Sequence, residues 1–441
     1  MKKKIFLFML CCVIICFNSL FAVTSKELKV EFKKLRSRIK EIKNQREKIP
    51  YEIKKLIRKA KKNYKEGNLD EAYSLLKEAD SLLEEKENDS NKESKLLSNK
   101  NEVLFFDFHY RLACKRPNLF VNHELLDGVI IIVPWSIVEP NPNKYNFAKI
   151  DKLINIWKKA NKTIVLRIIP YGQKDGNMVT PKWVFQKTPY ITFFSKKRGK
   201  VKIPKVWNSN FLKIYVSFIK ELAKHYNNNP AVKYIEIGIG HIGYLTVQPA
   251  SESVDAFIKA GWTKKIWEKY VKKLIDIYKQ YFYDKKLILT VTPLFLRGYY
   301  VKDNIDFTED IIKYAVNNNY YILFKGISEQ EKEFINTGIP QLVKFLASLD
   351  VKGLRIGFGD DWPLLGPTGK KIRTKNDFKK ALERIYQLWL DIDRKYSFFF
   401  VFLPNELAAT DKTNKHFDKD IYIFLKNYLK RFRIDNNGLK N

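Results

Sequence analysis

The sequence predicts an α/β protein whose main part is a closed (β/α)8 barrel, preceded by a small N-terminal α-helical hairpin. After residue 102, eight short runs of β-branched and apolar residues alternate with stretches of helical periodicity, which favours parallel strands joined by helical crossovers. The Gly-rich phosphate loop typical of open doubly wound sheets is absent from the sequence. The length of 441 residues accommodates one barrel of roughly 250 to 350 residues and a smaller element.

The first 22 residues have the pattern of a secretory signal peptide. Three lysines after Met1 precede a short apolar run from Ile5 to Cys16, and Ala22 is a small residue at which cleavage could occur. The apolar run is too short for a comfortable membrane span. We therefore expect a secreted, periplasmic or cell-envelope protein that contacts a membrane only through an uncleaved signal. The mature chain would keep one cysteine, Cys114, which excludes an intramolecular disulfide.

Residues 23–86 are highly charged, with apolar residues at helical spacing that include Leu28, Leu35 and Ile53. The stretch from Ala60 to Leu83 resembles one tetratricopeptide-like helical hairpin, which cannot bury its faces alone. We therefore expect a spacer or a docking element for a protein partner. Residues 87–101 are polar and rich in turn-forming residues, which is typical of a linker before the barrel at 102–441.

The net charge is strongly positive. The chain has 82 Lys and Arg against 48 Asp and Glu, for a formal charge of +34. Such an excess can attract polyanions, including acidic polysaccharide, nucleic acid or membrane. Lysine far outnumbers arginine and asparagine is abundant, which instead favours a compositional bias spread over all helices. We expect no nucleic-acid partner; a polyanion site would require clustering of the basic residues on one face.

The eight predicted strands of the barrel are Val103 to Phe108, Val129 to Val133, Thr163 to Ile169, Lys233 to Ile239, Leu287 to Val291, Tyr320 to Phe324, Leu354 to Phe358 and Ser397 to Phe402. The predicted helices are Asn210 to Tyr226, Lys264 to Tyr283, Ile305 to Val316, Gln330 to Leu349, Asp377 to Lys395 and Asp418 to Phe432. A further helix is expected to start at Phe147. In such a barrel, functional sites are built from the loops that follow the strands.

The second predicted strand carries the most informative motif. It ends in Pro134-Trp135, and a Pro- and Asn-rich turn with Glu139-Pro140 and Tyr145-Asn146-Phe147 precedes a helix that contains Ile150-Asp151. This pattern resembles the second βα unit of clan A glycoside hydrolases, in particular the family 42 β-galactosidase-like TIM barrels. An ordinary buried strand with a Pro turn is the alternative.

The resemblance continues through three further stretches, Val165 to Gly172, Thr180 to Val184 and Phe218 to Leu245. It implies a barrel that acts on a glycan. In the relatives that it resembles, a Gly-rich turn after the fourth strand ends in Gly-Glu, and that glutamate acts as the general acid. This chain has Gly243-Tyr244 there. A phenol with an ordinary pKa of about 10 is a poor general acid near neutrality.

Hydrolysis of a glycoside requires two carboxyl groups across the scissile bond, so an active enzyme would need another carboxylate in place of the missing acid. Glu236 lies on the predicted fourth strand; its alternative role is a barrel-interior carboxylate paired with Arg167 on the preceding strand, and the pairing is favoured. Glu406 follows Asn405 just beyond a strongly apolar strand, where a nucleophile could act. The clan A nucleophile follows strand seven, whereas Glu406 follows strand eight of the prediction. The alternative for Glu406 is a helix-start glutamate favoured by the helix dipole.

The turn after the predicted strand Leu354 to Phe358 offers Asp360 and Asp361 beside Trp362. Asp361 is a third catalytic candidate, and Asp360 and Trp362 could bind sugar, although Gly-Asp-Asp-Trp-Pro is also favourable turn chemistry. Aromatic rings stack on pyranose faces. The expected substrate-binding residues are therefore Trp135, Arg167, Tyr171, His241, Tyr244, Asp360, Trp362 and Asn405. The alternative is that large barrels simply need aromatic residues under their loops. No metal site or cofactor is predicted, because isolated histidines do not supply about three ligands at a recognisable spacing.

Two functions remain open from the sequence. The leading one is an exported glycoside hydrolase acting on O-glycosyl bonds of a glycan or oligosaccharide, with retention if two carboxylates lie close together and Glu406 is the nucleophile. The alternative is a non-catalytic carbohydrate-binding or cell-envelope scaffold protein of the same fold, because Tyr244 stands at the expected acid position. In both cases carbohydrate is the expected partner.

Overall fold

The computed structural model describes residues 24–44, 51–82, 102–108, 110–172, 179–196, 199–247, 251–292, 305–325, 335, 337–359 and 374–438. The chain divides into two compact units, Met1–Lys100 and Asn101–Asn441, each of which is described by itself. The predicted signal segment, the predicted linker and the turn that carries Asp360, Asp361 and Trp362 lie outside these residues. Within the described ranges, no helix combines the length and apolar character needed to cross a membrane.

The first unit contains α2 (Ser25–Asn44), α3 (Tyr51–Lys65) and helical residues 69–82. Gly67 allows the turn between the last two, because its φ of +82° lies in the left-handed region. These helices share a core whose buried members are Leu28, Leu35, Ile53, Ala60, Ala72, Leu76 and Ala79. Their spacing follows the predicted helical periodicity. The tetratricopeptide-like character and the partner that would dock there stay predictions.

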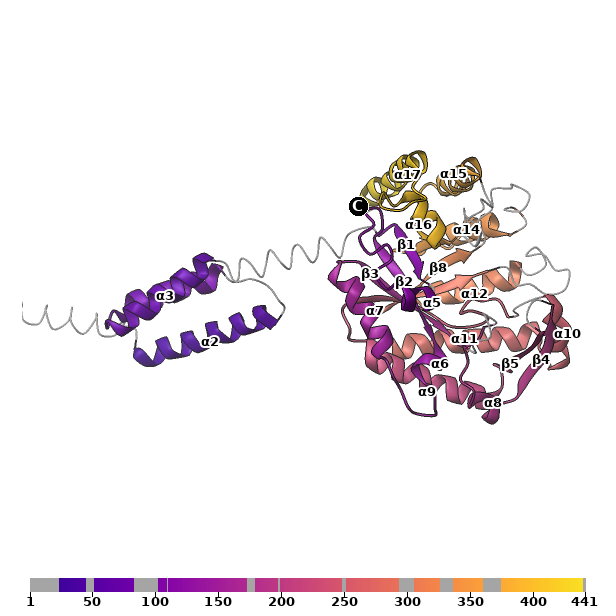
Figure 1. Cartoon of the computed structure of the whole chain (residues 1–441), viewed down its shortest axis with the longest axis horizontal. Coiled ribbons are helices and arrows are strands. Elements are labelled where there is room, and N and C mark those ends of the chain that lie inside the picture. Colours follow the sequence, from indigo (N-terminus) through magenta and orange to yellow (C-terminus); the bar gives the residue numbers. More distant parts are fainter. Residues whose placement is uncertain are drawn as a thin grey trace, which may run out of the picture. The chain divides into compact units, whose positions relative to one another are not determined.

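The second unit is a closed barrel of eight parallel strands, which confirms the predicted (β/α)8 fold (Figure 1). Neighbouring strands follow the order β1-β10-β9-β8-β7-β6-β3-β2, and β2 pairs with β1 to close the barrel. The barrel strands are β1 (Leu104–Phe108), β2 (Gly128–Pro134), β3 (Thr163–Ile169), β6 (Val232–Glu236), β7 (Lys286–Val291), β8 (Tyr320–Lys325), β9 (Arg355–Gly359) and β10 (Ser397–Phe402). Each corresponds to one predicted strand.

An antiparallel hairpin, β4 (Tyr190–Ser195) and β5 (Gly199–Pro204), lies between β3 and α9 and was not predicted. Among the described residues of the second unit, the helices are α5 (Tyr110–Lys115), α6 (Trp135–Val138), α7 (Ala148–Lys159), α8 (Val184–Lys187), α9 (Ser209–Tyr226), η2 (Ser251–Ser253), α10 (Val254–Lys259), α11 (Lys264–Tyr281), α12 (Ile305–Asn317), α14 (Ile339–Ser348), α15 (Lys375–Asp391), α16 (Pro404–Thr410) and α17 (Lys419–Gly438). Figure 1 shows the longer helices arranged around the strands.

Alternation along the strands divides their side chains between the barrel interior and the helices. One interior layer is apolar and contains Phe105, Ile130, Val165, Tyr234, Ile288, Leu323 and Phe399. Gly357 leaves room for this layer, because a Cβ at that position would lie 2.2 Å from the ring of Phe399. The next interior positions toward the carboxyl ends of the strands lie two residues further along each strand.

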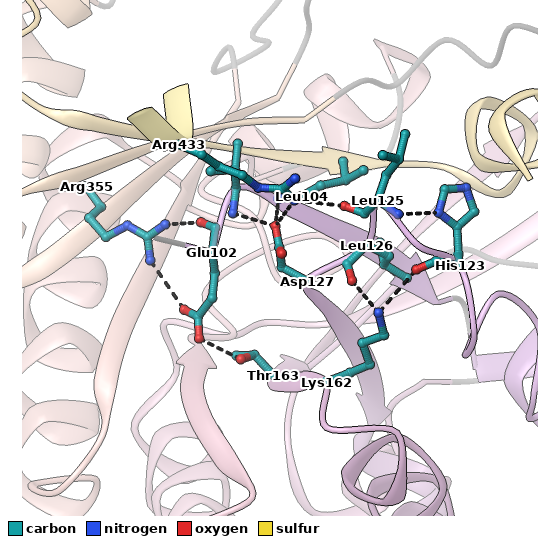
Figure 2. A network of polar contacts seen from close by, with 11 residues as sticks. Glu102, Leu104, His123, Leu125, Leu126, Asp127, Lys162, Thr163, Arg355 and Arg433 are labelled. Carbon is teal, nitrogen blue, oxygen red and sulfur yellow. Dashed lines mark hydrogen bonds and ion pairs between the residues drawn. The ribbon is translucent and has the colours of Figure 1, made fainter. Parts of the chain in front are cut away.

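The amino-terminal end of the barrel is closed by a polar network (Figure 2). Glu102 accepts hydrogen bonds from Thr163 Oγ1 (2.6 Å) and Lys233 Nζ (2.7 Å), and Arg355 donates to its carbonyl oxygen. Asp127 accepts from the backbone N–H groups of Val103 and Leu104 and from Arg433 Nη2 at 2.8 to 3.0 Å. These contacts join the beginnings of several strands. They place a stabilising network at the end of the barrel opposite the loops that usually carry function.

Candidate active site at the carboxyl end of the strands

Five polar side chains occupy the interior layer above the apolar one. Asp107, Arg167, Glu236, Thr290 and Lys325 each follow a residue of the apolar layer by two positions, so the strand period directs them inward. Their strands are β1, β3, β6, β7 and β8. All five are buried, with exposures of at most 1%. The barrel therefore holds a ring of charges just below its carboxyl-terminal mouth.

Two carboxylates and two cations balance each other in this ring. Arg167 Nε donates to Glu236 Oε1 (2.7 Å), and Arg167 Nη1 donates to both oxygens of Asp107 (2.9 Å). Lys325 Nζ donates to Asp107 Oδ2 (3.1 Å), and Thr290 Oγ1 donates to Glu236 Oε1 (2.5 Å). Because β3 and β6 are paired with Arg167 opposite Glu236, the register itself creates this ion pair.

The environment keeps Arg167 charged. Burial by itself lowers the pKa of its guanidinium, but the charges of Asp107 and Glu236 outweigh burial and raise that pKa well above its ordinary value. Removing charges from water costs several kcal/mol per ion, which only close pairing offsets. Well-packed apolar residues of the same volume would avoid this desolvation cost, so the ring of charges is not explained by stability alone.

The loop that follows β6 covers this ring and is held by backbone hydrogen bonds. Ile242 N donates to Tyr171 O (2.9 Å), Leu245 N to Thr290 O (2.9 Å) and Tyr171 Oη to Val247 O (2.7 Å). Ile242 has a φ of +52°, which is rare for a β-branched residue. Gly243, at +92°, has no room for a side chain, because a Cβ would lie 2.8 Å from Ile168 O. Strained backbone of this kind persists only where surrounding contacts fix it.

Tyr244 lies at the end of this turn, with its ring against the two cations. The centroid of the ring is 5.3 Å from the Arg167 guanidinium carbon and 6.0 Å from Lys325 Nζ. Both distances are in the range of cation–π attraction. The position that the resemblance assigns to a general acid thus carries an aromatic cover over Arg167 and Lys325.

Glu236 takes the role that was favoured for it, a barrel-interior carboxylate paired with Arg167. Its side chain has no exposed surface. A general acid must reach the leaving-group oxygen of the substrate. In this conformation Glu236 supports the position of Arg167.

Glu406 lies in the first turn of α16 and is fully buried. All eight barrel strands are accounted for, and β10 is the eighth along the chain, so Glu406 does follow strand eight. It therefore does not occupy the position of the clan A nucleophile, which follows strand seven. Asn405 is in the same helical turn. Strand seven is β9, and the turn with Asp360, Asp361 and Trp362 follows it outside the described residues.

The aromatic residues that were predicted to contact a substrate are mostly buried in the protein. Trp135 has no exposed surface: its ring stacks on Phe218 at 5.2 Å, and its Nε1 donates to Glu139 Oε2 (2.8 Å). Tyr171 is 1% exposed, and burial raises the pKa of its phenol well above the ordinary value. His241 is half-buried, with its ring centroid 6.4 Å from that of Tyr171. Trp135 and Tyr171 thus pack beneath the loops, and their contact with a substrate stays a prediction.

Asp107 and Lys325 were not among the residues predicted from the sequence. Asp107 lies inside the otherwise apolar strand LFFDF, and Lys325 is the charged last residue of YYILFK. Buried parallel strands are usually continuous apolar runs, so these interruptions were the available signal. Gly359 supports the arrangement, because a Cβ there would lie 2.4 Å from Lys325 Cδ. In the described part of the chain, no group of three His, Cys, Asp or Glu side chains could hold a metal ion.

Comparison with known proteins confirms the resemblance to glycoside hydrolase family 42. The sequence model of this β-galactosidase family matches residues 115–283, a wider stretch than the motifs indicated. Two β-galactosidases of Lactobacillus acidophilus are similar to this chain. LacZ is 27% identical over 117 residues, which are 25% of this chain and 16% of LacZ. LacA is 22% identical over 165 residues, which are 34% of this chain and 24% of LacA.

The matches therefore span less than a quarter of each curated relative's length. Among solved structures, the catalytic domain of β-amylase from Paenibacillus polymyxa aligns with 76% of this chain and 98% of that domain. Its TM-score is 0.49 and its sequence identity 12%. The chain has a glycoside-hydrolase-like TIM barrel, on the evidence of its strand pairing and the family match.

Proposed function

We propose that the carboxyl-terminal mouth of this barrel binds a glycan or oligosaccharide without hydrolysing it. The family match supports carbohydrate as the ligand. The observation that carries the non-catalytic assignment is Tyr244, whose ring lies over Arg167 where an acid would be needed. Glu236, the last residue of the strand β6 that precedes this loop, is buried and paired with Arg167.

Hydrolysis is the second candidate, and Glu406 favours it. Glu406 lies in the first turn of α16, directly after the eighth strand, where the loops of a parallel barrel carry function. Like Glu236 it is fully buried, so it would have to become accessible to reach a substrate. With Glu406 as nucleophile, retention would require a second carboxyl about 5 to 5.5 Å away, and inversion about 6.5 to 9.5 Å. Asp360 and Asp361, which follow strand seven in the sequence, are the partners to test.

The two functions are separated by assaying the same preparation for binding and for turnover. We expect isothermal titration calorimetry to detect binding of neutral oligosaccharides, and we expect no release of nitrophenol from aryl β-galactosides. E406Q would then leave sugar binding largely intact. Wild-type turnover that E406Q abolishes would instead establish a glycosidase.

Replacement of Tyr244 by the acid of the relatives is the complementary experiment. Y244E places a carboxyl group at the expected acid position, and the cations Arg167 and Lys325, which lie 5.3 and 6.0 Å from the Tyr244 ring, would help to balance the added charge. Hydrolysis gained by Y244E would support a binding protein related to an enzyme. If Y244E and the wild type both fail to bind any neutral oligosaccharide, the proposed function is wrong.

We also propose that the protein is exported, from the lysines and the apolar run before Ala22. N-terminal sequencing of protein from the producing cell tests this directly. A mature chain that starts near residue 23 outside the cytoplasm is expected. A chain that starts at Met1 in the cytosolic fraction would contradict export.

A further inference from the structure

Basic residues are concentrated in one part of the barrel. From residue 176 to residue 220 the sequence has ten Lys or Arg and no Asp or Glu. The whole chain has 48 acidic residues in 441, so about five would be expected in these 45 positions. This stretch, the basic segment, departs from the even spread of charge that the composition indicated. It includes α8, the β4–β5 hairpin and the first part of α9.

We propose that the basic segment binds an acidic polysaccharide, a sugar chain that carries carboxylate, sulfate or phosphate groups. The inference rests on the proposed function only for the class of ligand, carbohydrate. It adds a second site, on the outer surface beside the barrel mouth. Two separate surface features of the segment, a groove and a hairpin face, support it.

The groove has a volume of about 340 Å³ and is lined by residues that include Trp183, Lys187, Asn210 and Lys213. This volume suits one or two sugar rings. The indole of Trp183 is half-buried and held in place, because its Nε1 donates to Glu139 O (3.2 Å) and its ring meets Trp135 edge to face. A fixed aromatic face at the wall of a groove is a platform for a pyranose ring.

The basic side chains that line the groove favour a negatively charged ligand. Lys187 and Lys213 are exposed, and Lys187 Nζ lies 5.9 Å from the centroid of the Trp183 ring. A carboxylate on a sugar stacked against Trp183 would lie near these ammonium groups. Glu139 also lines the groove, but it is 2% exposed and its oxygens accept from Trp135 Nε1 and Asn143 N. Its charge is therefore directed into the protein.

The hairpin continues the same chemistry along the chain. Its strands alternate, so that Tyr190 and Phe194 are 46% and 70% exposed on one face while Ile191 and Phe193 are buried on the other. Lys200 is paired opposite Phe194 on this exposed face. The ring of Tyr190 contacts Phe185 of α8 edge to face at 6.1 Å, which places the hairpin beside the helix that carries Lys187.

Aromatic and basic side chains are thus present both in the groove and on the exposed face of the hairpin. An anionic lipid surface also attracts exposed aromatic and basic residues, but it is flat and cannot enter a groove that contains an anchored indole. An extended polysaccharide can occupy both features. The groove therefore favours an acidic sugar chain over a membrane.

The test uses the full-length chain and three probes: polygalacturonate, neutral dextran and phosphatidylglycerol vesicles. We expect polygalacturonate to bind and its affinity to fall steeply with salt. The groove variant K187Q/K213Q should weaken this binding about tenfold, since one exposed ion pair contributes up to a factor of about five. The control K269Q/K273Q removes two exposed lysines from α11 and should change the affinity less than about twofold.

Equal effects of the two lysine pairs would show that diffuse charge alone attracts the polymer, which would overturn the proposal. The proposal would also be overturned if the protein bound vesicles but not polygalacturonate, and if K187Q/K213Q weakened the binding to vesicles. All four lysines are exposed, so folding of the variants is expected and can be checked by circular dichroism. Failure of the barrel mouth to bind neutral oligosaccharides contradicts the proposed function alone, because the groove is assayed with a different probe and different variants.

Discussion

Arg167 is the residue on which the ring of charges depends, because it pairs with both Asp107 and Glu236. We expect R167M to lower the free energy of unfolding by about 3 to 5 kcal/mol, since it leaves two buried carboxylates facing each other with Lys325 as the remaining cation. Urea denaturation followed by circular dichroism measures this change. Exchange of the whole cluster for apolar residues should cost much less.

The matched control is an arginine in an exposed pair. Arg431 and Glu383 lie 3.3 Å apart, with both side chains 44% exposed. R431M should change the free energy of unfolding by less than about 1 kcal/mol, because solvent screens such pairs. Comparable losses in R167M and R431M would show that burial adds nothing to the Arg167 pairing.

His123 makes stability depend on pH. Burial lowers the pKa of its imidazole below the ordinary 6.5, although the charge of Asp411 opposes this. Leu125 N donates to Nδ1 (3.3 Å), so Nε2 carries the proton and donates to Thr410 Oγ1 (3.1 Å). The folded state therefore disfavours the protonated ring. The contribution of neutral His123 to the free energy of unfolding is fully present above pH 6.5. It is lost as the pH falls below 6.5 toward the folded-state pKa.

We expect H123N to remove part of this pH dependence, because the Asn oxygen can accept from Leu125 N and does not titrate. Thermal unfolding between pH 7.5 and 5.5 compares the variant with the wild type. H416N, which removes an exposed histidine, is the control. A slope with pH that is the same in H123N and wild type would contradict a neutral buried His123.

At the scale of single residues, the sequence predicted the pairing of Arg167 with Glu236 but not the pairing of Asp107 with Lys325. Arg167 and Glu236 could be paired because adjacent parallel strands bring residues at equal depth together. The contact between Asp107 and Lys325 crosses the interior from β1 to β8, 218 positions along the chain. No local periodicity encodes such a contact, since it depends on closure of the barrel.

Among the elements, the loop after β6 positions Tyr244, and Gly243 permits its path. We expect G243A to destabilise the protein by more than the cost of left-handed backbone alone, which is about 1 to 2 kcal/mol. The added methyl group would also collide with Ile168 O, 2.8 Å away. Denaturant unfolding gives the loss, and near-ultraviolet circular dichroism reports displacement of the aromatic cover.

A substitution at Gly199 distinguishes the backbone cost from the steric collision. The φ of Gly199, +69°, is also left-handed, but no atom lies within 4 Å of a Cβ built there. G199A should therefore show the backbone cost without the collision. If G199A and G243A lose equal stability, the contact with Ile168 O does not constrain the loop.

Prediction succeeded for elements whose sequence directly reflects their burial. Barrel strands such as β2 are buried at every position and read as β-branched runs. The β4–β5 hairpin was missed because its exposed positions carry Tyr190, Phe194 and lysines. The lysines of β5 and the prolines that flank the hairpin hide the alternation that identifies a strand.

Across the whole barrel, the two ends have different roles. The amino-terminal end is closed by the network around Glu102, which stabilises the joined strands (Figure 2). The carboxyl-terminal end holds the ring of charges, the aromatic cover and the groove beside it. The geometry of parallel strands separates these ends, so stability and binding should respond to different substitutions.

E102Q tests this separation. It removes the charge that faces Lys233 and Arg355, so we expect the free energy of unfolding to fall by about 3 kcal/mol. Below the unfolding transition, the dissociation constants for neutral oligosaccharide and for polygalacturonate should equal those of the wild type, because no binding group contacts Glu102. R167M should lower stability and also weaken oligosaccharide binding at the mouth. If E102Q weakens sugar binding as strongly as R167M, the carbohydrate site does not lie at the carboxyl end of the strands.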